Sequence, residues 1–446
     1  MKFSEKKPTK KLHMVSLGCT KNLVDSEVML GRLRDYEITD DAQNADLIIV
    51  NTCGFIDSAK EESLNTILNL HEDRKKESVL VMAGCLSQRY QGELQKELPE
   101  IDIFTGVGDY DKIDKLVNEK RSSFSNEVFL ASDEDERVIT GSSFHAFVKL
   151  SEGCNQTCSF CAIPSFKGKL HSRTLESLVK EVTNLVKKGF KDFSFVSQDS
   201  SSYLRDLGFN DGLEKLIDAV EKIDGVKTAR ILYLYPSTTT FNLIDKIASS
   251  KVFVNYFDMP LQHISQNMLK IMKRGKGAEK LRELMEYMKS KPNSFVRTTF
   301  IAGHPGESEE DFEELCEFVE NFGFDRSNVF SYSDEEGTTA QTRDDKIEQE
   351  LIDERAEILG EIISNTTLKS LKNDIGKTFE VYISGESDEH EYLLSARKTI
   401  WAPEIDGEIY INDNENEEKI VFGDIYEVLI TDIAGDKLLA KIIKKV

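Results

Sequence analysis

Three cysteines lie close together in one short run of the chain. Cys154, Cys158 and Cys161 follow the pattern CxxxCxxC within the segment EGCNQTCSFCAIP. Three thiolates at this spacing suit three corners of a cubic iron–sulfur cluster, because a short loop can turn each sulfur toward one small inorganic body. The fourth iron then has no protein ligand. An open iron can bind a small molecule and act on it, whereas a fully ligated cluster mainly carries electrons.

Zinc is the main alternative occupant of this run. Structural zinc sites have four ligands, which usually come as two separated pairs. Cys158 and Cys161 form one such pair, but Cys154 is too near to be half of a second one. His171 could complete a zinc site only through an unusual loop. A disulfide is a further alternative, and the spacing favours a cluster over both.

Three other cysteines share a second local pattern. Each lies at the end of a short apolar run, next to a glycine, and precedes a polar helical stretch. These cysteines are Cys19, Cys53 and Cys85. Uninterrupted apolar runs of this length are typical of parallel strands covered on both faces. Ligands of such sheets gather beyond the carboxyl ends of the strands. The pattern therefore predicts a second three-cysteine site, the alternative being three small buried apolar residues.

The composition is that of a soluble globular protein with two or three domains. Of its 446 residues, 39% are hydrophobic and 31% are charged. No apolar stretch approaches about 18 residues, so we expect no membrane span. The amino terminus lacks the apolar core of a signal peptide. Free cysteines in a cluster-like arrangement favour a reducing interior, so the expected location is cytoplasmic.

Acidic residues outnumber basic ones. The chain has 57 Lys and Arg against 80 Asp and Glu, a net charge of −23. This disfavours sequence-independent binding to nucleic acid, which needs an excess of basic residues. It suits a basic protein partner, although acid that only keeps the surface soluble is an equal alternative. Residues 371–446 share the excess, with nine Lys or Arg against seventeen Asp or Glu, whereas an RNA-binding domain should be basic.

The order of expected elements gives an α/β chain of three domains. Residues 1–137 alternate strands and helices, as in a Rossmann-like parallel-sheet domain. They close with an acidic stretch at 132–137 that looks like a linker, with a surface loop as the alternative. Residues 138–370 hold six strand–helix units and a long polar helix, which predicts a partial (βα)6 TIM-like barrel. Residues 371–446 predict a small antiparallel β-barrel.

The cysteine run follows the first strand of the expected central barrel. We expect the six barrel strands at residues 144–150, 193–196, 231–235, 252–257, 295–301 and 329–332. Active sites of such barrels lie at the carboxyl ends of the strands. The cysteine run is therefore placed where a βα barrel carries its chemistry.

The CxxxCxxC loop on the first strand of a βα barrel resembles the radical S-adenosylmethionine enzymes. The three-domain layout is similar to their methylthiotransferase branch, which ends in a TRAM-type barrel. The run GCTKNLVDSE at 18–27 resembles the RimO-type members, whereas MiaB-type tRNA enzymes usually have Gln-Met-Asn in place of Thr20-Lys21-Asn22. Further similar motifs are LYLYP, YFDMPLQHI, RTTFI and APEIDG. The resemblance covers nearly the whole chain.

This resemblance implies an enzyme that inserts a methylthio group at the β-carbon of an aspartate in small-subunit ribosomal protein S-twelve. Such a C–H bond has no acidity to exploit, so a radical must break it, and a cofactor supplies that radical. The implied cofactors are S-adenosylmethionine and two [4Fe–4S] clusters. One cluster would generate a deoxyadenosyl radical and the other would present sulfur. The implied ligands, which we also take as the catalytic residues, are Cys154, Cys158 and Cys161 for the first cluster and Cys19, Cys53 and Cys85 for the second.

Other barrel residues are candidate contacts to S-adenosylmethionine. Phe160 lies between two of the cysteines, and Gln198 and Asp199 end the second expected strand. The turn from Gly303 to Glu307 could let the backbone approach the cofactor. Packing or plain loop structure is the alternative for each. The basic stretches at 167–173 and 273–276 could touch RNA, with solvated faces as the alternative.

Three expectations concern partners, and two alternative functions remain. We expect protein S-twelve as substrate, an electron donor such as flavodoxin or ferredoxin, and a monomer. A tRNA methylthiotransferase is the first alternative, and the acidic terminal domain disfavours it. An iron–sulfur carrier or sensor without turnover is the second. It does not explain why six strand–helix units should frame the cysteine loop.

Overall fold

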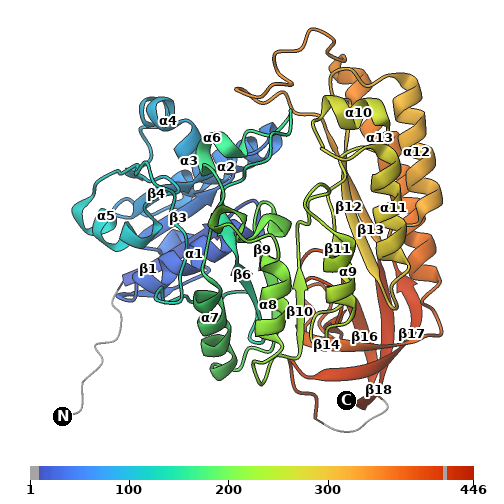
Figure 1. Ribbon diagram of the computed structural model, residues 1–446. Coiled ribbons are helices and arrows are strands. Elements are labelled where there is room, and N and C mark those ends of the chain that lie inside the picture. Colours follow the sequence, from blue (N-terminus) through green and yellow to red (C-terminus); the bar gives the residue numbers. More distant parts are fainter. Residues whose placement is uncertain (1–9, 415–418) are drawn as a thin grey trace.

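The structure is a computed structural model that describes residues 10–414 and 419–446. It contains a parallel sheet near the amino terminus, a larger arc of parallel strands, and a small closed barrel near the carboxyl terminus (Figure 1). In Figure 1 the first sheet lies to the left of the arc and the small barrel lies below it. None of the helices in the described ranges is long and apolar enough to cross a membrane.

The amino-terminal sheet has five parallel strands in the order β2-β1-β3-β4-β5. Alternate residues of β3 face opposite sides, with Leu47 and Ile49 in one buried cluster and Ile48 and Val50 in another. Helices cover both faces, which is why the inner strands β3 and β4 are largely apolar. The strands are β1 Lys10–Ser16, β2 Tyr36–Ile38, β3 Leu47–Thr52, β4 Val79–Gly84 and β5 Ile103–Phe104. The helices are α1 Thr20–Arg32, α2 Asp57–Asp73, α3 Cys85–Arg89, α4 Gln91–Glu97 and α5 Ile113–Glu119, with 3-10 turns at Ala42–Asn44 and Tyr110–Lys112.

The central strands form an open arc of six parallel strands, so the predicted partial barrel is confirmed. Strands β10, β9 and β6 make one sheet and β11, β12 and β13 make the other. The sheets meet where Ala229 bridges Phe253 and where the Leu234 N–H donates to the Asp258 carbonyl over 2.8 Å. The strands are β6 His145–Lys149, β9 Asp192–Val196, β10 Thr228–Ile231, β11 Tyr256–Asp258, β12 Phe295–Ala302 and β13 Arg326–Ser331.

Two expected barrel strands are wrongly placed. The strand expected at 231–235 ends at Ile231, and the one expected at 252–257 is reduced to Tyr256–Asp258 after a single bridge. The apolar run does not mark where a strand stops, because Leu232 and Leu234 beyond β10 are themselves buried. Tyr233 between them has a φ of +62°, which ends the extended conformation.

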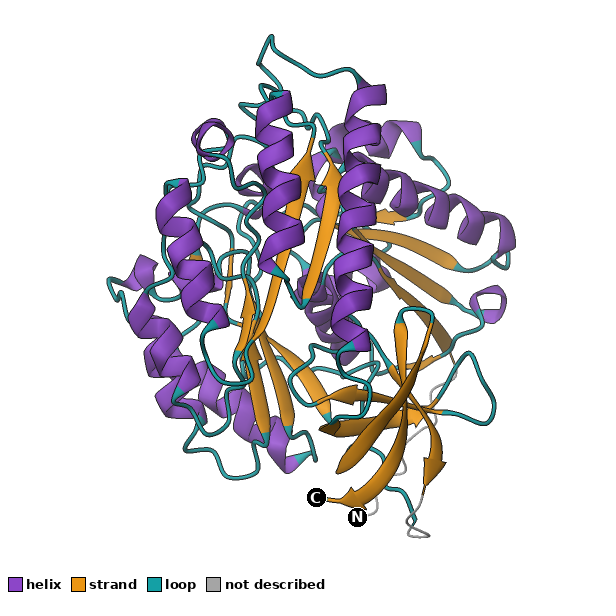
Figure 2. Ribbon diagram, turned by 90° about the vertical axis from the view of Figure 1, so that its right-hand side faces the viewer, coloured by secondary structure: helices purple, strands orange, loops and turns teal. Residues whose placement is uncertain are grey.

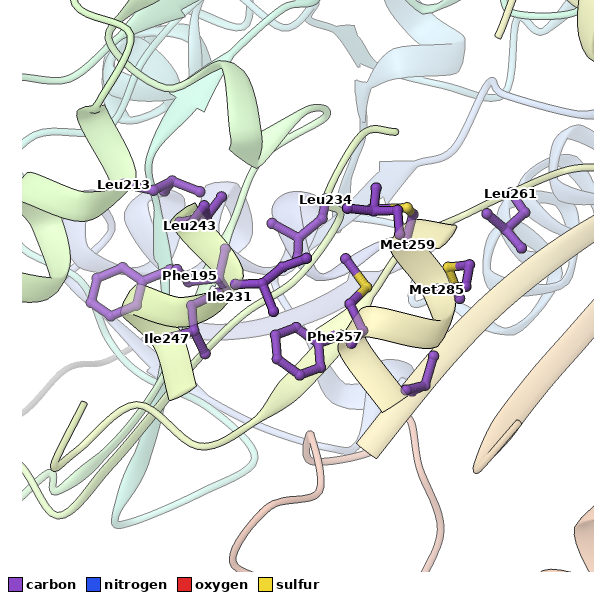
Figure 3. Close-up of a cluster of buried hydrophobic side chains, with 14 of the residues drawn as sticks. Phe195, Leu213, Ile231, Leu234, Leu243, Ile247, Phe257, Met259, Leu261 and Met285 are labelled. Carbon is purple, nitrogen blue, oxygen red and sulfur yellow. The ribbon is translucent and has the colours of Figure 1, made fainter. Parts of the chain in front are cut away.

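Helices line the outer side of the arc and bury its largest apolar core (Figure 2). Figure 3 shows side chains of the strands meeting those of the helices in this core, among them Phe195, Ile231, Leu243 and Met285. The helices are α6 Ile163–Lys167, α7 Leu175–Lys187, α8 Gly212–Val220, α9 Phe241–Ala248, α10 Gln266–Ile271, α11 Ala278–Lys289, α12 Glu309–Phe322 and α13 Gln349–Lys372. Short pieces are the strands β7 Ser151–Glu152 and β8 His171–Ser172 and the 3-10 turns Ser200–Ser202 and Arg205–Leu207.

The carboxyl-terminal barrel is closed in the order β14-β15-β16-β18-β17. Four of its pairings are antiparallel as predicted, but β16 and β18 run parallel. Alternating apolar residues reveal which face of a strand is buried but not the direction of its neighbour, so the sequence could not show this pairing. The strands are β14 Thr378–Glu386, β15 Leu394–Lys398, β16 Ile409–Asn414, β17 Ile425–Ala434 and β18 Lys437–Lys445.

This small barrel docks on the amino-terminal ends of the central strands. Arg397 of β15 pairs with Asp192, the first residue of β9, and Tyr382 of β14 contacts Thr228, the first residue of β10, over 2.9 Å. The cysteine run lies beyond the opposite, carboxyl ends of the strands. The terminal barrel therefore supports the arc from the side away from the cysteines.

The acidic stretch at 132–137, expected as a linker or a surface loop, contains no helix or strand, and its last residue is anchored between the two neighbouring parts of the chain. Arg137 is buried and its guanidinium pairs with Glu27 of α1 and with Glu181 of α7. A Cβ atom at Gly31 would lie 1.9 Å from the Glu136 carbonyl oxygen, so the stretch lies directly on α1. The stretch holds the parallel sheet to the central arc.

Candidate functional site

The first three cysteines gather at the carboxyl edge of the parallel sheet. Cys53 directly follows β3, Cys85 directly follows β4, and Cys19 precedes α1 just after β1. Strands β1, β3 and β4 are direct neighbours and run parallel, so their carboxyl ends meet. We call these residues the sheet trio.

Short-range contacts hold the sheet trio together. A Cβ atom at Gly18, whose φ is +85°, would lie 2.8 Å from Cys53 Sγ, so only glycine lets the Cys19 loop approach Cys53 this closely. The Cys85 thiol donates to Asn22 Oδ1 over 3.7 Å. Burial raises the pKa of Cys53 to about 11 and that of Cys85 to about 12, and neighbouring thiols of the trio add to both shifts. Cys85 is thus buried in this site, while Cys19 and Cys53 are half-buried.

The other three cysteines, the loop trio, lie on the loop after β6 and β7. Gly153 starts this loop with a φ of +76°, and a Cβ atom there would lie 2.1 Å from the Lys169 carbonyl oxygen. The Cys154 N–H donates to the Gly168 carbonyl over 3.1 Å. Burial raises the pKa of both Cys154 and Cys161 to about 12, and Cys158 adds to both shifts.

Two residues that we did not single out hold the middle cysteine of the loop trio. Arg274 donates from Nη1 to Cys158 Sγ over 3.2 Å, and the Tyr235 hydroxyl lies 3.4 Å from the same sulfur. The Arg274 guanidinium also stacks 4.4 Å from the centre of the Tyr235 ring. Arg274 is 4% exposed, so the expectation of RNA contact or a solvated face at 273–276 is wrong for it.

The candidate cofactor contacts form two groups, one beside the loop trio and one at the turn from Gly303 to Glu307. Gln198 donates to Glu152, two residues before Cys154, and Asp199 accepts from Gln156 Nε2 over 2.7 Å, so both are near the loop trio. Phe160 meets His304 edge to face, with ring centres 6.3 Å apart. At the turn beyond it, the Glu307 carboxylate accepts from the Gly303 N–H over 3.1 Å and from Arg355 over 2.8 Å.

A buried charge cluster lies between the two trios, and sequence reasoning missed it. It consists of Asp25 on α1, Lys149 on β6, Glu152 on β7 and Lys167 on α6. Lys149 Nζ lies 2.7 Å from Glu152, and Lys167 Nζ lies 3.2 Å from Glu152 and 3.6 Å from Asp25. Burial would raise the pKa of Glu152, but the two lysines outweigh it and lower the pKa to about 2.

The expectation for the basic stretch at 167–173 is wrong at both ends, because Lys167 and Arg173 are 4% exposed. The available signal was a lysine and a glutamate, Lys149 and Glu152, next to an otherwise apolar strand that leads into the cysteine loop. Charges in such a strand must be paired if they are buried. The sequence does not show which residues pair with Lys149 and Glu152.

The donor groups fit iron–sulfur clusters. Three thiols are a ligand set of such clusters, and metal binding deprotonates thiols that burial otherwise keeps neutral. Buried polar atoms beside the trios, among them Thr20 Oγ1 and Gln198 Oε1, have no hydrogen-bond partner among the residues that the structure describes. Such atoms normally have one. Within the described ranges no three His, Cys, Asp or Glu side chains converge on a point that would hold a single metal ion.

All three parts of the chain match known protein families. Residues 11–106 match the uncharacterized protein family UPF0004, residues 148–319 the radical SAM superfamily and residues 375–443 the TRAM domain. Among solved structures, the radical S-adenosylmethionine methyltransferase TsrM from Kitasatospora setae has a similar fold, with a TM-score of 0.51 at 14% identity. The match covers 73% of this chain and 74% of that one.

Curated relatives are much more similar. The ribosomal protein uS12 methylthiotransferase RimO of Aliarcobacter butzleri (strain RM4018) is 80% identical over 446 residues, the whole of both chains. The protein of the same name from Sulfurovum sp. (strain NBC37-1) is 64% identical over 98% of this chain and 99% of its own length. Identity at this level across all three parts confirms the resemblance. The chain belongs to the RimO family of ribosomal protein uS12 methylthiotransferases, within the radical SAM superfamily.

Proposed function

We propose that this chain replaces a hydrogen on the β-carbon of an aspartate in ribosomal protein uS12, the small-subunit protein S-twelve, with a methylthio group. The chain is a radical SAM methylthiotransferase by family, and its relatives are named for uS12. The observation that supports the finer proposal is the placement of the two trios beside one buried charge cluster. A substrate carbon bound beside that cluster would face both trios.

The six cysteines would hold two clusters, one on each trio. When bound, these groups and S-adenosylmethionine supply a radical that can break an unactivated C–H bond, and a place from which sulfur is delivered. The protein's part is to bind and to orient. Gln198 Oε1, buried without a partner in the described structure, offers a hydrogen-bond acceptor beside the loop trio. Arg274 and Tyr235 hold Cys158 from the barrel side.

The overall reaction balances without a net reductant. The C–H bond of the acceptor and the C5′–S bond of one S-adenosylmethionine break, and a C–S bond forms. The hydrogen ends on 5′-deoxyadenosine and methionine leaves. A sulfide ion takes its methyl group from a second S-adenosylmethionine. Joining the C–H carbon to the methylthiolate is a two-electron oxidation. Cleavage of the C5′–S bond to give 5′-deoxyadenosine and methionine is a two-electron reduction, so the two changes cancel.

The surroundings of this reaction are also part of the proposal. An electron donor such as flavodoxin or ferredoxin would start each cycle, and the protein would act as a cytoplasmic monomer. All seven cysteines are free thiols in the structure, which suits a reducing compartment.

The experiment that tests the proposal is anaerobic incubation of the reconstituted full-length protein with uS12, S-adenosylmethionine and a low-potential reductant. We expect deoxyadenosine together with one methylthio group on a single aspartate of uS12, located by mass spectrometry of peptides. Unmodified uS12 with a methylthiolated tRNA adenosine would move the chain to the tRNA branch. No deoxyadenosine at all would leave an iron–sulfur carrier.

Counting iron tests the proposal of two clusters. We expect about eight irons per reconstituted chain and about four in Cys85→Ser, because a [4Fe–4S] cluster needs its full set of ligands. The control is Cys316→Ser, since Cys316 packs against the barrel core on α12, outside both trios. Equal iron in wild type and Cys85→Ser would show that the sheet trio binds no cluster.

A further inference from the structure

Lys21 is a largely buried lysine whose ammonium makes no ion pair with another described residue. It lies in the first turn of α1, two residues after Cys19, and is 8% exposed. Its Nζ lies 3.9 Å from the centre of the Tyr233 ring. No hydrogen bond or ion pair joins it to another residue in the described part of the chain. The nearby Lys149 and Lys167 are both ion-paired.

An ammonium in this position is suited to bind an anion. Burying a charge is costly unless it is paired, and stacking on an aromatic ring offsets only part of that cost. A lysine also has three N–H donors, and a ring face satisfies none of them as a hydrogen-bond acceptor does. Lys21 is therefore arranged to receive a ligand.

The carboxylates near Lys21 are already paired. They are Asp25 and Glu152, and both are committed to Lys149 and Lys167. Neither carboxylate forms an ion pair with Lys21 in the described part of the chain.

Lys21 connects the two trios. Cys19 of the sheet trio is the N-cap residue of its helix, α1. Its aromatic partner Tyr233 lies in the segment after β10, two residues before Tyr235, which contacts Cys158 of the loop trio over 3.4 Å. Tyr233 is held in place because its N–H donates to Asp258 Oδ2 over 3.0 Å. A ligand bound to the Lys21 ammonium therefore lies between the two cysteine sites.

We propose that Lys21 binds the side-chain carboxylate of the acceptor aspartate in uS12, an inference that rests on the proposed function. The carboxyl carbon of aspartate is bonded directly to the β-carbon. Anchoring the carboxylate therefore fixes the reacting carbon one bond away, between the two trios. An ammonium also discriminates between a carboxylate and the uncharged amide of asparagine, so Lys21 makes the enzyme specific for aspartate.

A double-mutant cycle tests this pairing directly. The enzyme variants are wild type, Lys21→Met, Lys21→Gln and Lys21→Arg, all as reconstituted full-length protein. The ligands are uS12 and uS12 with asparagine at the acceptor position. Binding is measured by fluorescence anisotropy of labelled uS12 without reductant, so the readout does not depend on turnover, and kcat and KM are measured separately.

We expect Lys21→Met and Lys21→Gln to weaken binding of unmodified uS12 by roughly 10- to 100-fold, the usual effect of losing a hydrogen bond to a charged group. Binding of the asparagine form should be weak and change little. Lys21→Arg should retain part of the preference for aspartate. The matched control is Lys215→Met on the outer helix α8, which also removes a lysine from an aromatic ring, that of Phe209, and should leave binding unchanged.

Two results would overturn the inference. If neutral variants weaken both forms of uS12 equally, Lys21 serves the cluster held by Cys19 or the packing of the two domains. If they weaken neither, Lys21 does not contact the substrate. Both results leave the proposed function standing as long as wild type still modifies uS12. If wild type fails to modify it, the proposed function itself is wrong.

Discussion

Arg274 places its guanidinium 3.2 Å from the sulfur of Cys158. These residues are 116 positions apart in the chain and meet only because the segment after α10 folds back over the cysteine loop. Arg274 also donates to the Pro260 carbonyl and stacks on Tyr235, so its position is fixed. A positive charge is thus held against one proposed cluster ligand.

Removing that charge should make the loop-trio cluster harder to reduce. Hydrogen bonds and positive charge at a ligand sulfur stabilise the reduced cluster and raise its reduction potential. We expect Arg274→Met to lower the midpoint potential in an anaerobic redox titration followed by electron paramagnetic resonance, and to slow deoxyadenosine formation. Arg282→Met is the control, because Arg282 stacks on Phe318 on the outer helices. An unchanged potential would show that Arg274 only packs the loop.

A methyl group at Gly153 should prevent the loop trio from forming. It would lie 2.1 Å from the Lys169 carbonyl oxygen, so the cysteine loop would have to move. We expect Gly153→Ala to bind about half the iron of wild type after reconstitution, since one of two clusters is lost. Gly208→Ala is the matched control, because Gly208 also has a positive φ, +87°, but nothing lies within 4 Å of its added Cβ. It should cost only about 1–2 kcal/mol of stability and keep all its iron. Equal iron in both variants would contradict the steric argument.

Truncating Arg137 should loosen the contact between the parallel sheet and the central arc. It would leave Glu27 buried without its charged partner, which typically costs about 3–5 kcal/mol, whereas Glu181 would keep its ion pair with Arg173. Hydrogen exchange followed by mass spectrometry should show faster exchange in α1 and α7 of Arg137→Met. Arg32→Met removes a half-exposed ion pair with Asp135 and should cost less than about 1 kcal/mol. Similar exchange in the two variants would mean that Arg137 does not hold the domains together.

Asp406 should make the protein less stable as the pH rises from about 4 to 6. Burial raises its pKa to about 6 against the pull of Arg297, so the folded state keeps a proton that the unfolded chain gives up near pH 4. Stability from this group is therefore present below pH 4 and lost as the pH rises to about 6, by about 3 kcal/mol. Urea unfolding at pH 4.5 and 7 should show a smaller decrease for Asp406→Asn than for wild type. Asp224→Asn on the surface is the control, and an identical pH dependence in all three proteins would contradict the assignment.

The architecture could be predicted because local patterns carry it. The inner strands β3 and β4 of the amino-terminal sheet are largely apolar runs, and β3 shows why, since both of its faces are buried. Six strand–helix units in a row leave few topologies open besides a parallel arc. The end of β10 was misjudged because Leu232 continues the apolar run after the strand has stopped. The direction of β18 relative to β16 has no local signature at all.

The sequence by itself determined which cysteines belong together. Spacing groups Cys154, Cys158 and Cys161 within one loop, and the ends of three parallel strands group Cys19, Cys53 and Cys85. Both follow from local geometry, because backbone connectivity limits where a residue near a strand end can lie. The family resemblance rests on the same local motifs.

Only the tertiary structure decided what surrounds the cysteines. Lys167 and Arg274 are in stretches that look like ordinary surface charge, and their burial appears only when Asp25, Glu152 and Cys158 are brought to them. The partners Asp25 and Lys149 are 124 residues apart. The local sequence does not show whether a charged residue is paired, because the group that offsets the cost of burying it lies elsewhere in the chain. Lys21 illustrates the same point, since its lack of a partner is visible only in the folded molecule.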